Sequence, residues 1–397
     1  MHPSPSQARH SLLRLRSDGG KVEMVELFFD LVFVFAITQL SHGLLAELSG
    51  TNTLRIGILL LAVWWVWICT SWITNWLDPN RPPVRSMLFV LMLVGLVLSA
   101  SIPEAFGSTQ DDKGWAFALA YVLMQVGRTL FTLWAVRGER QNLVRNFQRI
   151  LVWMLLSGVC WLAGGWSDSS ARLAWWGLAL MIDFAAPWCF YWVPGLGRAS
   201  LQDWDVDGGH LAERCALFVI IALGESLLVS GATFATHAWN AHSLLAFVTT
   251  FAGTVAMWWL YFAIGAEQGH HSIKHSEQAG RQARVAYTYM HILIVAGIIV
   301  CAVADELVLA HPDHADNPAL VAILGGPALY LLGTALFKWV TASRALPPLS
   351  HIVGLVLLGL LCIPASQHAF SAMGLSAATA AVLWVVAIWE SRSLRKK

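Results

Sequence analysis

Long apolar runs separated by short polar segments dominate the chain. Each run holds about 20 residues, enough for a helix to cross roughly 30 Å of hydrocarbon. Within the runs, apolar and polar residues do not alternate, so a membrane β-barrel is not expected. The pattern predicts twelve transmembrane helices, with a short eleventh, which begin near Glu26, Leu54, Val84, Gly114, Phe147, Ala171, His210, Ser243, Ala283, Asn317, Leu349 and Phe370.

The twelve runs fall into two successive sets of six whose marker residues recur in the same order. The separation of matched markers only grows, from 187 residues between Glu26 and Glu213 to 207 between Asp183 and Glu390. Short loop insertions would have this effect, so we interpret the pattern as a duplicated six-helix unit, a common plan in transporters. The intervening matches are Trp64-Trp65 with Trp258-Trp259, Gly95 with Gly297, Glu104 with Glu306, and Gly127-x-x-Leu130-Phe131 with Gly333-x-x-Leu336-Phe337.

These observations predict an all-α, polytopic membrane protein built from two six-helix repeats. The expected parts are a basic tail at 1–25, a first repeat at 26–194, a polar linker at 195–209, a second repeat at 210–391 and a basic tail at 392–397. In the sixth helix Pro187 follows Asp183 by four residues, which predicts a bend there. The helix itself is expected to continue through the aromatic residues 188–192 until Pro194 ends it.

Composition excludes a soluble domain. The chain is 57% hydrophobic and 12% charged, with a mean hydropathy of +0.61, whereas soluble domains are about a quarter charged. Basic residues gather in the tails and in the loops on their side of the membrane, and only Arg55, Lys113 and Arg172 fall on the other side. Positive charge stays on the cytoplasmic face, so both termini are predicted to be cytoplasmic. The run after Glu26 has no small-residue cleavage site, so a removable signal peptide is not expected.

The sequence contains no catalytic, nucleotide-binding or cofactor-binding signature. Its six cysteines lie within apolar runs and are read as packing residues. The spacing of Asp203, Asp205 and Asp207 resembles the start of a calcium loop, but Arg214 stands where the bidentate glutamate belongs. The histidines at 270, 271 and 275 are read as part of a hydrated loop. We therefore expect no metal, no cofactor, no nucleic-acid partner and no enzymatic activity.

Ionisable residues inside the first six runs are the first candidates for function. Glu26 and Asp30 share a face of the first helix, with His42 near that face further along. Arg128 lies in the middle of the fourth helix and Asp183 in the sixth. Such residues are costly in a membrane unless they meet protein, water or a cation. They indicate either a polar transport path or structural pairing, with Asp30, Asp183 and Glu225 as competing carboxylate partners for Arg128.

The second set repeats this theme. His210 and Glu213 open the seventh helix, and Glu225 and Ser226 lie deep within it. A hydroxyl beside a deep carboxylate suits a polar pocket or an ion path, while pairing of Glu225 with a buried arginine is the alternative. His291 in the ninth helix is close to two tyrosines. It could titrate near neutral pH, but a single hydrogen bond is the favoured role.

Two segments resemble a known family. Residues 25–41, read as VELFFDLVFVFAITQLS, and residues 210–226, read as HLAERCALFVIIALGES, resemble the two signatures of the bacterial low temperature requirement protein A (LtrA) family. The stretch from Tyr287 through His291 to Gly297 fits as well. The resemblance spans nearly the whole chain and implies a multi-pass protein of the bacterial inner membrane. It implies no molecular activity.

The leading functional hypothesis is a secondary transporter or channel for a small ion or solute, with a polar path between the two repeats that contains Asp30 and Glu225. The alternatives are an intramembrane enzyme acting on a lipid or isoprenoid, and a membrane scaffold or sensor without flux. The expected partners are the lipid bilayer and an unidentified small ion or solute. Substrate, coupling and oligomeric state, including a homo-oligomer, are left open.

Overall fold

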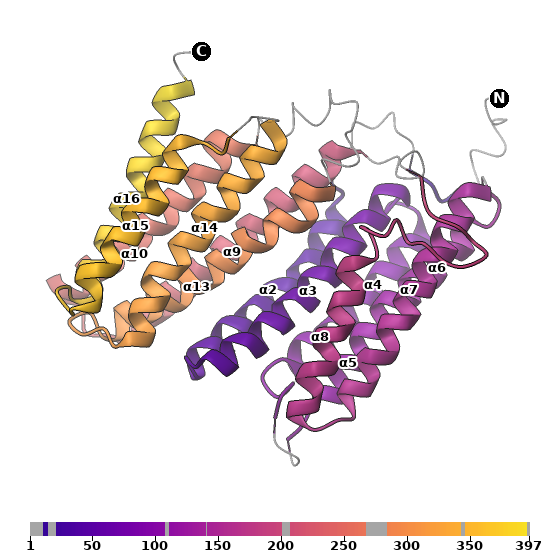
Figure 1. Ribbon diagram of the computed structural model, residues 1–397, viewed down its shortest axis with the longest axis horizontal. Helices are drawn as coiled ribbons and strands as arrows, with labels where there is room; N and C mark the ends of the chain where they lie inside the picture. Colours follow the sequence, from indigo (N-terminus) through magenta and orange to yellow (C-terminus); the bar gives the residue numbers. More distant parts are fainter. Residues whose placement is uncertain are drawn as a thin grey trace. The chain divides into compact units, whose positions relative to one another are not determined.

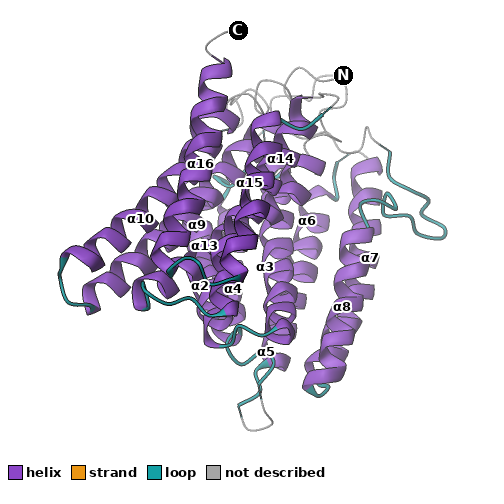
Figure 2. Cartoon of the chain, turned by 60° about the vertical axis from the view of Figure 1, so that its left-hand side comes forward, coloured by secondary structure: helices purple, strands orange, loops and turns teal. Residues whose placement is uncertain are grey.

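The computed structural model of the protein describes residues 11–14, 21–107, 111–139, 141–200, 207–266, 284–342 and 346–394. These residues form twelve helices and, apart from two isolated bridges, no β-structure, which confirms the predicted all-α fold (Figures 1 and 2). With η marking π-helical stretches, the helices are α2 (Met24–Ala46), α3 (Gly50–Trp76), α4 (Pro82–Ser101), α5 (Gly114–Val122) continued by η2 (Leu123–Gly127) and α6 (Arg128–Val136), α7 (Gln141–Gly165), α8 (Ser169–Ala185), α9 (Gly208–Thr236), α10 (Ala241–Trp258) continued by η4 (Trp259–Ala266), η5 (Arg284–Met290) continued by α13 (His291–Ala310), α14 (Asn317–Ala342), α15 (Leu349–Ser366) and α16 (Ala372–Leu394).

By their internal contacts the helices divide into two compact units. The first comprises Met1–Leu40 and Thr53–Leu211, and the second comprises Ser41–Asn52 and Ala212–Lys397. Each unit is a bundle of long helices. In the first, α7 packs against both α5 and α8, and in the second, α13 packs against α14 while α10 and α15 pack against α16 (Figure 1). The predicted repeat and the cytoplasmic placement of the termini stay predictions.

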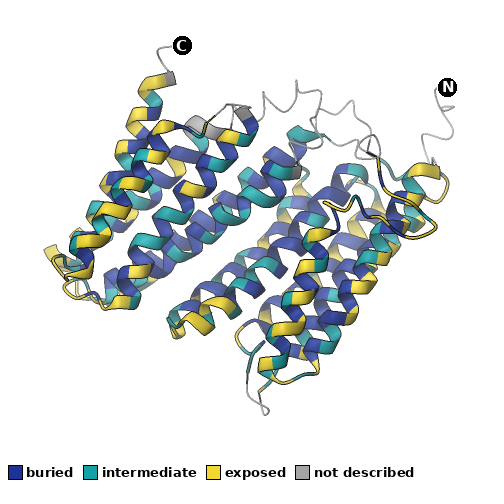
Figure 3. Cartoon of the chain, viewed as in Figure 1, coloured by how far each residue is buried: buried dark blue, intermediate teal, exposed yellow. Residues whose placement is uncertain are grey.

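Helix length and surface both fit a bilayer. Eleven of the described helices are long and apolar enough to cross a membrane, and the twelfth, α8, has 17 residues. Within each bundle the buried positions face neighbouring helices, whereas exposed positions lie along outer faces such as those of α8 and α16 (Figure 3). Many of those exposed side chains are apolar, including Val159 at 66% and Met181 at 63% exposure. Large exposed apolar surfaces of this kind suit contact with lipid.

Local sequence determines where several helices begin. The Asp168 carboxylate accepts hydrogen bonds from the backbone N–H groups of Ser170 and Ala171, 2.9 and 3.0 Å away, and so caps α8. Asn240 and Ser243 form a reciprocal capping box at the start of α10. Both arrangements satisfy backbone N–H groups that have no partner within the helix.

The end of the sixth helix differs from the prediction. Helix α8 ends at Ala185, so it neither bends at Pro187 nor reaches Pro194. Proline has no N–H to donate to the carbonyl of Asp183 four residues earlier, and its ring crowds that turn. The chain then reverses through Phe190 and Tyr191, which adopt φ angles of 51° and 47°. The predicted continuation through residues 188–192 was therefore wrong.

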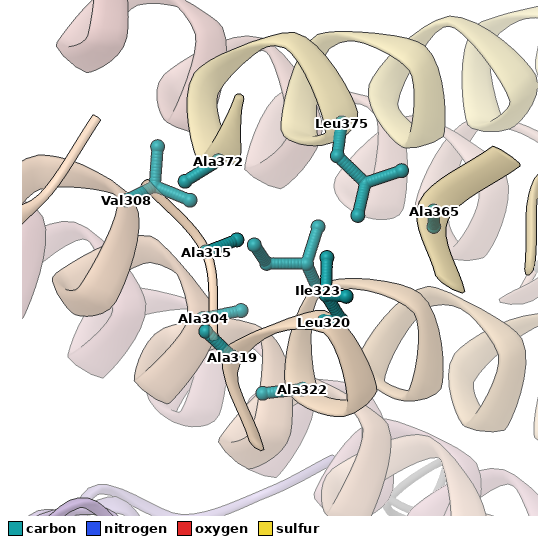
Figure 4. Close-up of a cluster of buried hydrophobic side chains, with 10 residues drawn as sticks. All are labelled: Ala304, Val308, Ala315, Ala319, Leu320, Ala322, Ile323, Ala365, Ala372 and Leu375. Atoms are coloured by element: carbon teal, nitrogen blue, oxygen red, sulfur yellow. The ribbon is translucent and has the colours of Figure 1, made fainter. Parts of the chain in front are cut away.

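Close packing of α13 against α14 depends on glycines. A Cβ atom on Gly297 would lie 2.5 Å from the backbone nitrogen of Tyr330, and one on Gly333 would lie 2.7 Å from the backbone nitrogen of Ile294. The two helices thus approach to backbone contact, as small residues allow within membranes. Toward the turn that joins these helices, an apolar cluster fills the space between α13, α14, α15 and α16 (Figure 4). Its buried members are Ala304, Val308, Ala315, Ala319, Leu320, Ala322, Ile323, Ala365, Ala372 and Leu375.

In the first unit, Arg172 joins several chain segments at one end of the bundle. Its wholly buried guanidinium donates to both carboxylate oxygens of Asp112, over 2.7 and 2.6 Å. It also donates to four backbone carbonyls, those of Ala105, Gly164, Gly165 and Ser167. We call this set the Arg172 clamp. It ties α8 to the α4–α5 connection and to the end of α7.

The clamp predicts an acid-sensitive contribution to stability. Partial burial acts to raise the pKa of Asp112, but hydrogen bonds from Arg172 and the Gly114 N–H outweigh it and lower the pKa below its ordinary value of 3.8. The ionised Asp112 therefore stabilises the folded protein above pH 3.8. This stabilisation is lost as the pH falls through the lower pKa that Asp112 has in the folded state. We expect Asp112→Asn to lower the thermal unfolding temperature near pH 6, with the difference from wild type shrinking toward about pH 3.

Thermal unfolding of the detergent-solubilised protein across that pH range is the measurement, and the neighbouring exposed Asp111 gives the matched control Asp111→Asn. An Asp112→Asn difference that stays constant with pH would contradict the assignment.

Candidate functional site

A polar group lies inside the second unit where α9, α10 and α13 meet. The Ser226 hydroxyl on α9 donates to Oδ2 of Asp305 on α13 over 3.0 Å, and it lies 3.3 Å from the Thr254 hydroxyl on α10. Ser226 is fully buried and Asp305 is 9% exposed. Both residues belong to helices long and apolar enough to span a membrane, so an ionisable group here points to function.

The residues beside this hydrogen bond are also acidic. Glu225 precedes Ser226 on α9 and Glu306 follows Asp305 on α13. Glu225 is 3% exposed and Glu306 is half-buried. The charge of Glu306 interacts with that of Glu225, and also with the exposed His42. We call Glu225, Ser226, Asp305 and Glu306 the α9–α13 acidic cluster. The cluster thus contains three carboxyl groups, one on α9 and two on α13.

A cavity of about 30 Å³ adjoins Asp305. That volume exceeds the roughly 10–15 Å³ that one water molecule requires. Five of its lining residues carry side-chain oxygens, and the wall is completed by small or apolar side chains. The lining residues are Thr250, Gly253, Thr254, Met257, Cys301, Ala304, Asp305, Ile323, Pro327, Ser376, Thr379, Ala380 and Leu383.

His291 occupies a separate aromatic pocket in the same unit. Its Nδ1 lies 2.9 Å from the carbonyl oxygen of Ala286, and its Nε2 lies 2.7 Å from the Tyr261 hydroxyl. A carbonyl can only accept, so Nδ1 carries the proton and Nε2 accepts from Tyr261 in the neutral ring. Tyr287 and Phe337 pack on the imidazole. This geometry fits the favoured prediction of a hydrogen-bonding role for His291.

Lys338 and Glu390 form a further buried pair. The Lys338 ammonium lies 2.7 Å from Oε2 of Glu390 and donates to the carbonyl of Leu260 over 3.1 Å. His351 lies 3.9 Å from the same carboxylate. The sequence identified Glu390 only as a marker of duplication, so this pair was missed.

In the first unit, Glu26 and His210 lie together. Oε1 of Glu26 is 2.9 Å from Nε2 of His210, and Arg14 lies 3.7 Å from the other carboxylate oxygen. Nδ1 of His210 is 3.3 Å from the Asn75 amide nitrogen. The same nitrogen donates to the backbone carbonyl of Asp207, and the Asn75 amide oxygen accepts from the Asp207 N–H. These contacts join the start of α9 to α2 and α3. Glu213, the predicted counterpart of Glu26, is exposed.

Asp30 and Asp183 in the first unit accept hydrogen bonds from aromatic side chains. Trp67 donates its indole N–H to Asp30 over 2.8 Å. The Tyr121 hydroxyl and the Trp161 indole donate to Oδ2 of Asp183 over 2.7 and 3.2 Å. All of these side chains are buried.

Arg128 is not ion-paired among the described residues. Its guanidinium donates to the carbonyl of Val66, to the Thr70 hydroxyl over 2.8 Å, and to the side-chain oxygen of Gln125. The expectation that a buried carboxylate would pair with it is therefore wrong. The π-helical turn η2 ends directly before Arg128, and such turns often occur at functional positions. Neutral oxygens from two helices meet the guanidinium there instead of a carboxylate.

The structure thus distributes the ten predicted residues over several groups. Glu26 joins His210, and Glu225 and Ser226 join Glu306 and Asp305. Asp30, Arg128, Asp183 and His291 each have their own partners. Asp305 was missed, although like Glu225 it is an acidic residue within an apolar run, and that signal could have found it. Asp203 and Asp205, whose spacing resembles the start of a calcium loop, and the histidines at 270, 271 and 275 lie outside the described residues.

Comparisons with known proteins find similarity over nearly the whole chain. The model of the family described as bacterial low temperature requirement A protein (LtrA) matches residues 21–388. Uncharacterized protein RA0937 of Rhizobium meliloti (strain 1021) is 39% identical over 390 residues, which cover 97% of this chain and 93% of that protein. No solved structure is significantly similar.

Proposed function

Because the chain belongs to the bacterial low temperature requirement A protein (LtrA) family, and is a multi-pass helical membrane protein, we propose that it transports a small ion or solute across the bacterial inner membrane. The observation that carries the proposal is the Asp305 carboxylate, held by Ser226 inside a helix long enough to span a membrane and beside a cavity with several oxygen-bearing lining residues. Carboxylates at such depth mark ion and substrate pathways in membrane proteins.

The α9–α13 acidic cluster extends this argument. Asp305 binds a hydroxyl and adjoins the cavity, while Glu225 and Glu306 share one charged neighbourhood next to it. Like charges held close together favour binding of a proton or another cation, which relieves their repulsion. A cation or proton could therefore pass between the cavity and the two glutamates. The path proposed here lies within the second unit.

A matched contact in each unit supports the duplicated architecture common among transporters. Val66 and Leu260 each follow a pair of tryptophans directly. In the first unit the carbonyl of Val66 accepts from Arg128, and in the second the carbonyl of Leu260 accepts from Lys338. Each donor belongs to the helix of its unit that carries the G-x-x-L-F marker. Arg128 directly follows the marker glycine, whereas Lys338 lies one helical turn further along. In each unit, a carbonyl that follows a tryptophan pair thus accepts a hydrogen bond from a positively charged side chain.

Flux into liposomes tests the proposal. Purified protein is reconstituted at matched density, and uptake of monovalent cations, protons and small solutes is measured under imposed gradients. We expect Asp305→Asn to lower flux by about tenfold or more, because losing a charged hydrogen-bond partner costs about 1.5–3 kcal/mol and 1.4 kcal/mol is tenfold. Glu47→Gln, in an exposed loop position of the second unit, is the control and should transport normally.

Two outcomes would overturn the proposal. One is the absence of any flux by folded wild-type protein under every gradient. The other is unchanged flux in Asp305→Asn, Glu225→Gln and Glu306→Gln at normal membrane abundance, which is the result that a scaffold or sensor predicts.

A further inference from the structure

We infer that the cavity beside Asp305 binds a single, largely dehydrated monovalent metal cation of about the size of Na⁺. The inference deepens the proposed function and, as the identity of the transported or coupling ion, rests on it. As a binding site it is open to a separate test. Five features of the cavity lead to it: its size, the orientation of its hydroxyls, its charge, its ligand types and the proline in its wall.

Size restricts what the cavity can hold. At about 30 Å³ for water-sized occupants, it has room for roughly two waters or for one small ion with little of its hydration shell. A sugar, amino acid or lipid fragment needs a pocket about ten times larger. The occupant is therefore water or a small ion.

The three threonine hydroxyls on the wall donate their protons to backbone carbonyls of their own helices. Thr250 donates to the carbonyl of Phe247 over 3.0 Å, Thr254 to that of Thr250 over 3.4 Å, and Thr379 to that of Ser376 over 2.9 Å. Once a hydroxyl has donated its one proton, it can only offer lone pairs. These three oxygens are thereby left as acceptors, which suits a cation and not an anion.

The charge of the wall points the same way. Among the described residues, Asp305 is the only acidic one that lines the cavity, and no lysine, arginine or histidine does. A single carboxylate balances one positive charge. Calcium sites draw on six to eight oxygens and more than one carboxylate. Transition metals favour nitrogen and sulfur ligands, and the described lining offers only the sulfurs of Met257 and Cys301. A monovalent hard cation is the remaining class.

Pro327 adds a further acceptor to this wall. It lies inside α14 and has no N–H, so the carbonyl of Ile323 four residues earlier has no helical donor. Ile323 and Pro327 both line the cavity. Freed carbonyls of interrupted membrane helices are a recurrent source of ligands for Na⁺.

Direct binding of ²²Na⁺ to the purified, detergent-solubilised protein tests the inference without any transport step. We expect saturable binding of ²²Na⁺. Unlabelled Na⁺ and Li⁺ should compete with it, and choline should not. Asp305→Asn should weaken binding by about tenfold or more and Thr250→Val by several-fold, because each removes a ligand and charged contacts are the stronger. Thr249→Val is the matched control, since Thr249 bonds its own helix and is not part of the wall.

The outcomes separate this inference from the proposed function. Binding without flux would support the site and count against transport, whereas flux of another ion without ²²Na⁺ binding would overturn the site and leave transport standing. Equal ²²Na⁺ affinity in wild type, Thr250→Val and Asp305→Asn would also overturn it. Should Asp305→Asn fail to fold, Thr250→Val compared with Thr249→Val decides the question. Displacement of ²²Na⁺ by K⁺ at equal concentration would contradict the assigned ion size.

Discussion

Replacing Arg172 with methionine is expected to remove most folded protein from the membrane. The side chain is wholly buried and makes six hydrogen bonds, two to Asp112 and four to backbone carbonyls. Methionine would fill similar space but leave those acceptors without their donor. Breaking a buried pair costs about 3–5 kcal/mol, although the 28% exposure of the Asp112 side chain reduces this figure. A total stability of about 5–15 kcal/mol leaves little margin.

The measurement is thermal unfolding of the detergent-solubilised protein, together with its abundance in membranes. Arg172→Lys should not restore stability, because an ammonium cannot reproduce the two parallel bonds to Asp112. Arg55→Met is the matched control, since Arg55 lies in the same unit and donates to the Ser169 hydroxyl over 3.1 Å. If Arg172→Met unfolds at the same temperature as Arg55→Met, the clamp does not hold this end of the unit.

Substituting Gly333 with alanine is expected to disrupt the second unit, whereas the same change at Gly127, its predicted counterpart, should be harmless. A Cβ on Gly333 would lie 2.7 Å from the backbone nitrogen of Ile294, an atom that cannot move without displacing α13. A Cβ on Gly127 would have no heavy atom within 4 Å. Forcing extra volume into a packed contact costs about 1–3 kcal/mol and sometimes more.

Parallel unfolding curves of Gly333→Ala and Gly127→Ala provide the comparison, with Gly297→Ala as an independent disruption of the same contact from the α13 side. We expect both α13–α14 variants to be less stable than wild type, and Gly127→Ala to match wild type or exceed it slightly, since alanine favours helix over glycine. Equal effects at positions 127 and 333 would show that the close approach of α13 and α14 does not contribute to stability.

Hydropathy was sufficient to predict the fold class because each helix must satisfy its own backbone in lipid. The twelve runs correspond to twelve described helices, and the largest error in a starting point is at Phe147, where α7 begins at Gln141. Polar residues at that start, Asn142 and Arg145, hid the first turns from a hydropathy reading. The early end of α8 at Ala185 was missed because the aromatic residues after Pro187 continue the apolar run without being helical.

The site was harder to predict because depth in the membrane does not identify partners. The sequence indicated that Glu225 and Ser226 lie deep in α9, but it could not show that Ser226 faces Asp305. For Arg128 the sequence offered three competing carboxylates as pairing partners, whereas the guanidinium donates to neutral oxygens of Val66, Thr70 and Gln125. Which helices lie side by side depends on how their side chains pack, and hydropathy does not predict that packing. The π-helical stretches are equally invisible to an apolar pattern.

The apolar cluster of Figure 4 has a consequence for how fast the protein could work. Ala304 and Ile323 belong both to that cluster and to the wall of the cavity, so hydrocarbon closes the way from Asp305 toward the α13–α14 turn. An ion could leave on that side only after the helices that carry the apolar cluster move apart. Collective helix motions of this kind take microseconds to milliseconds. Turnover by such a gate would follow the pace of a carrier, many orders of magnitude below free diffusion through an open pore.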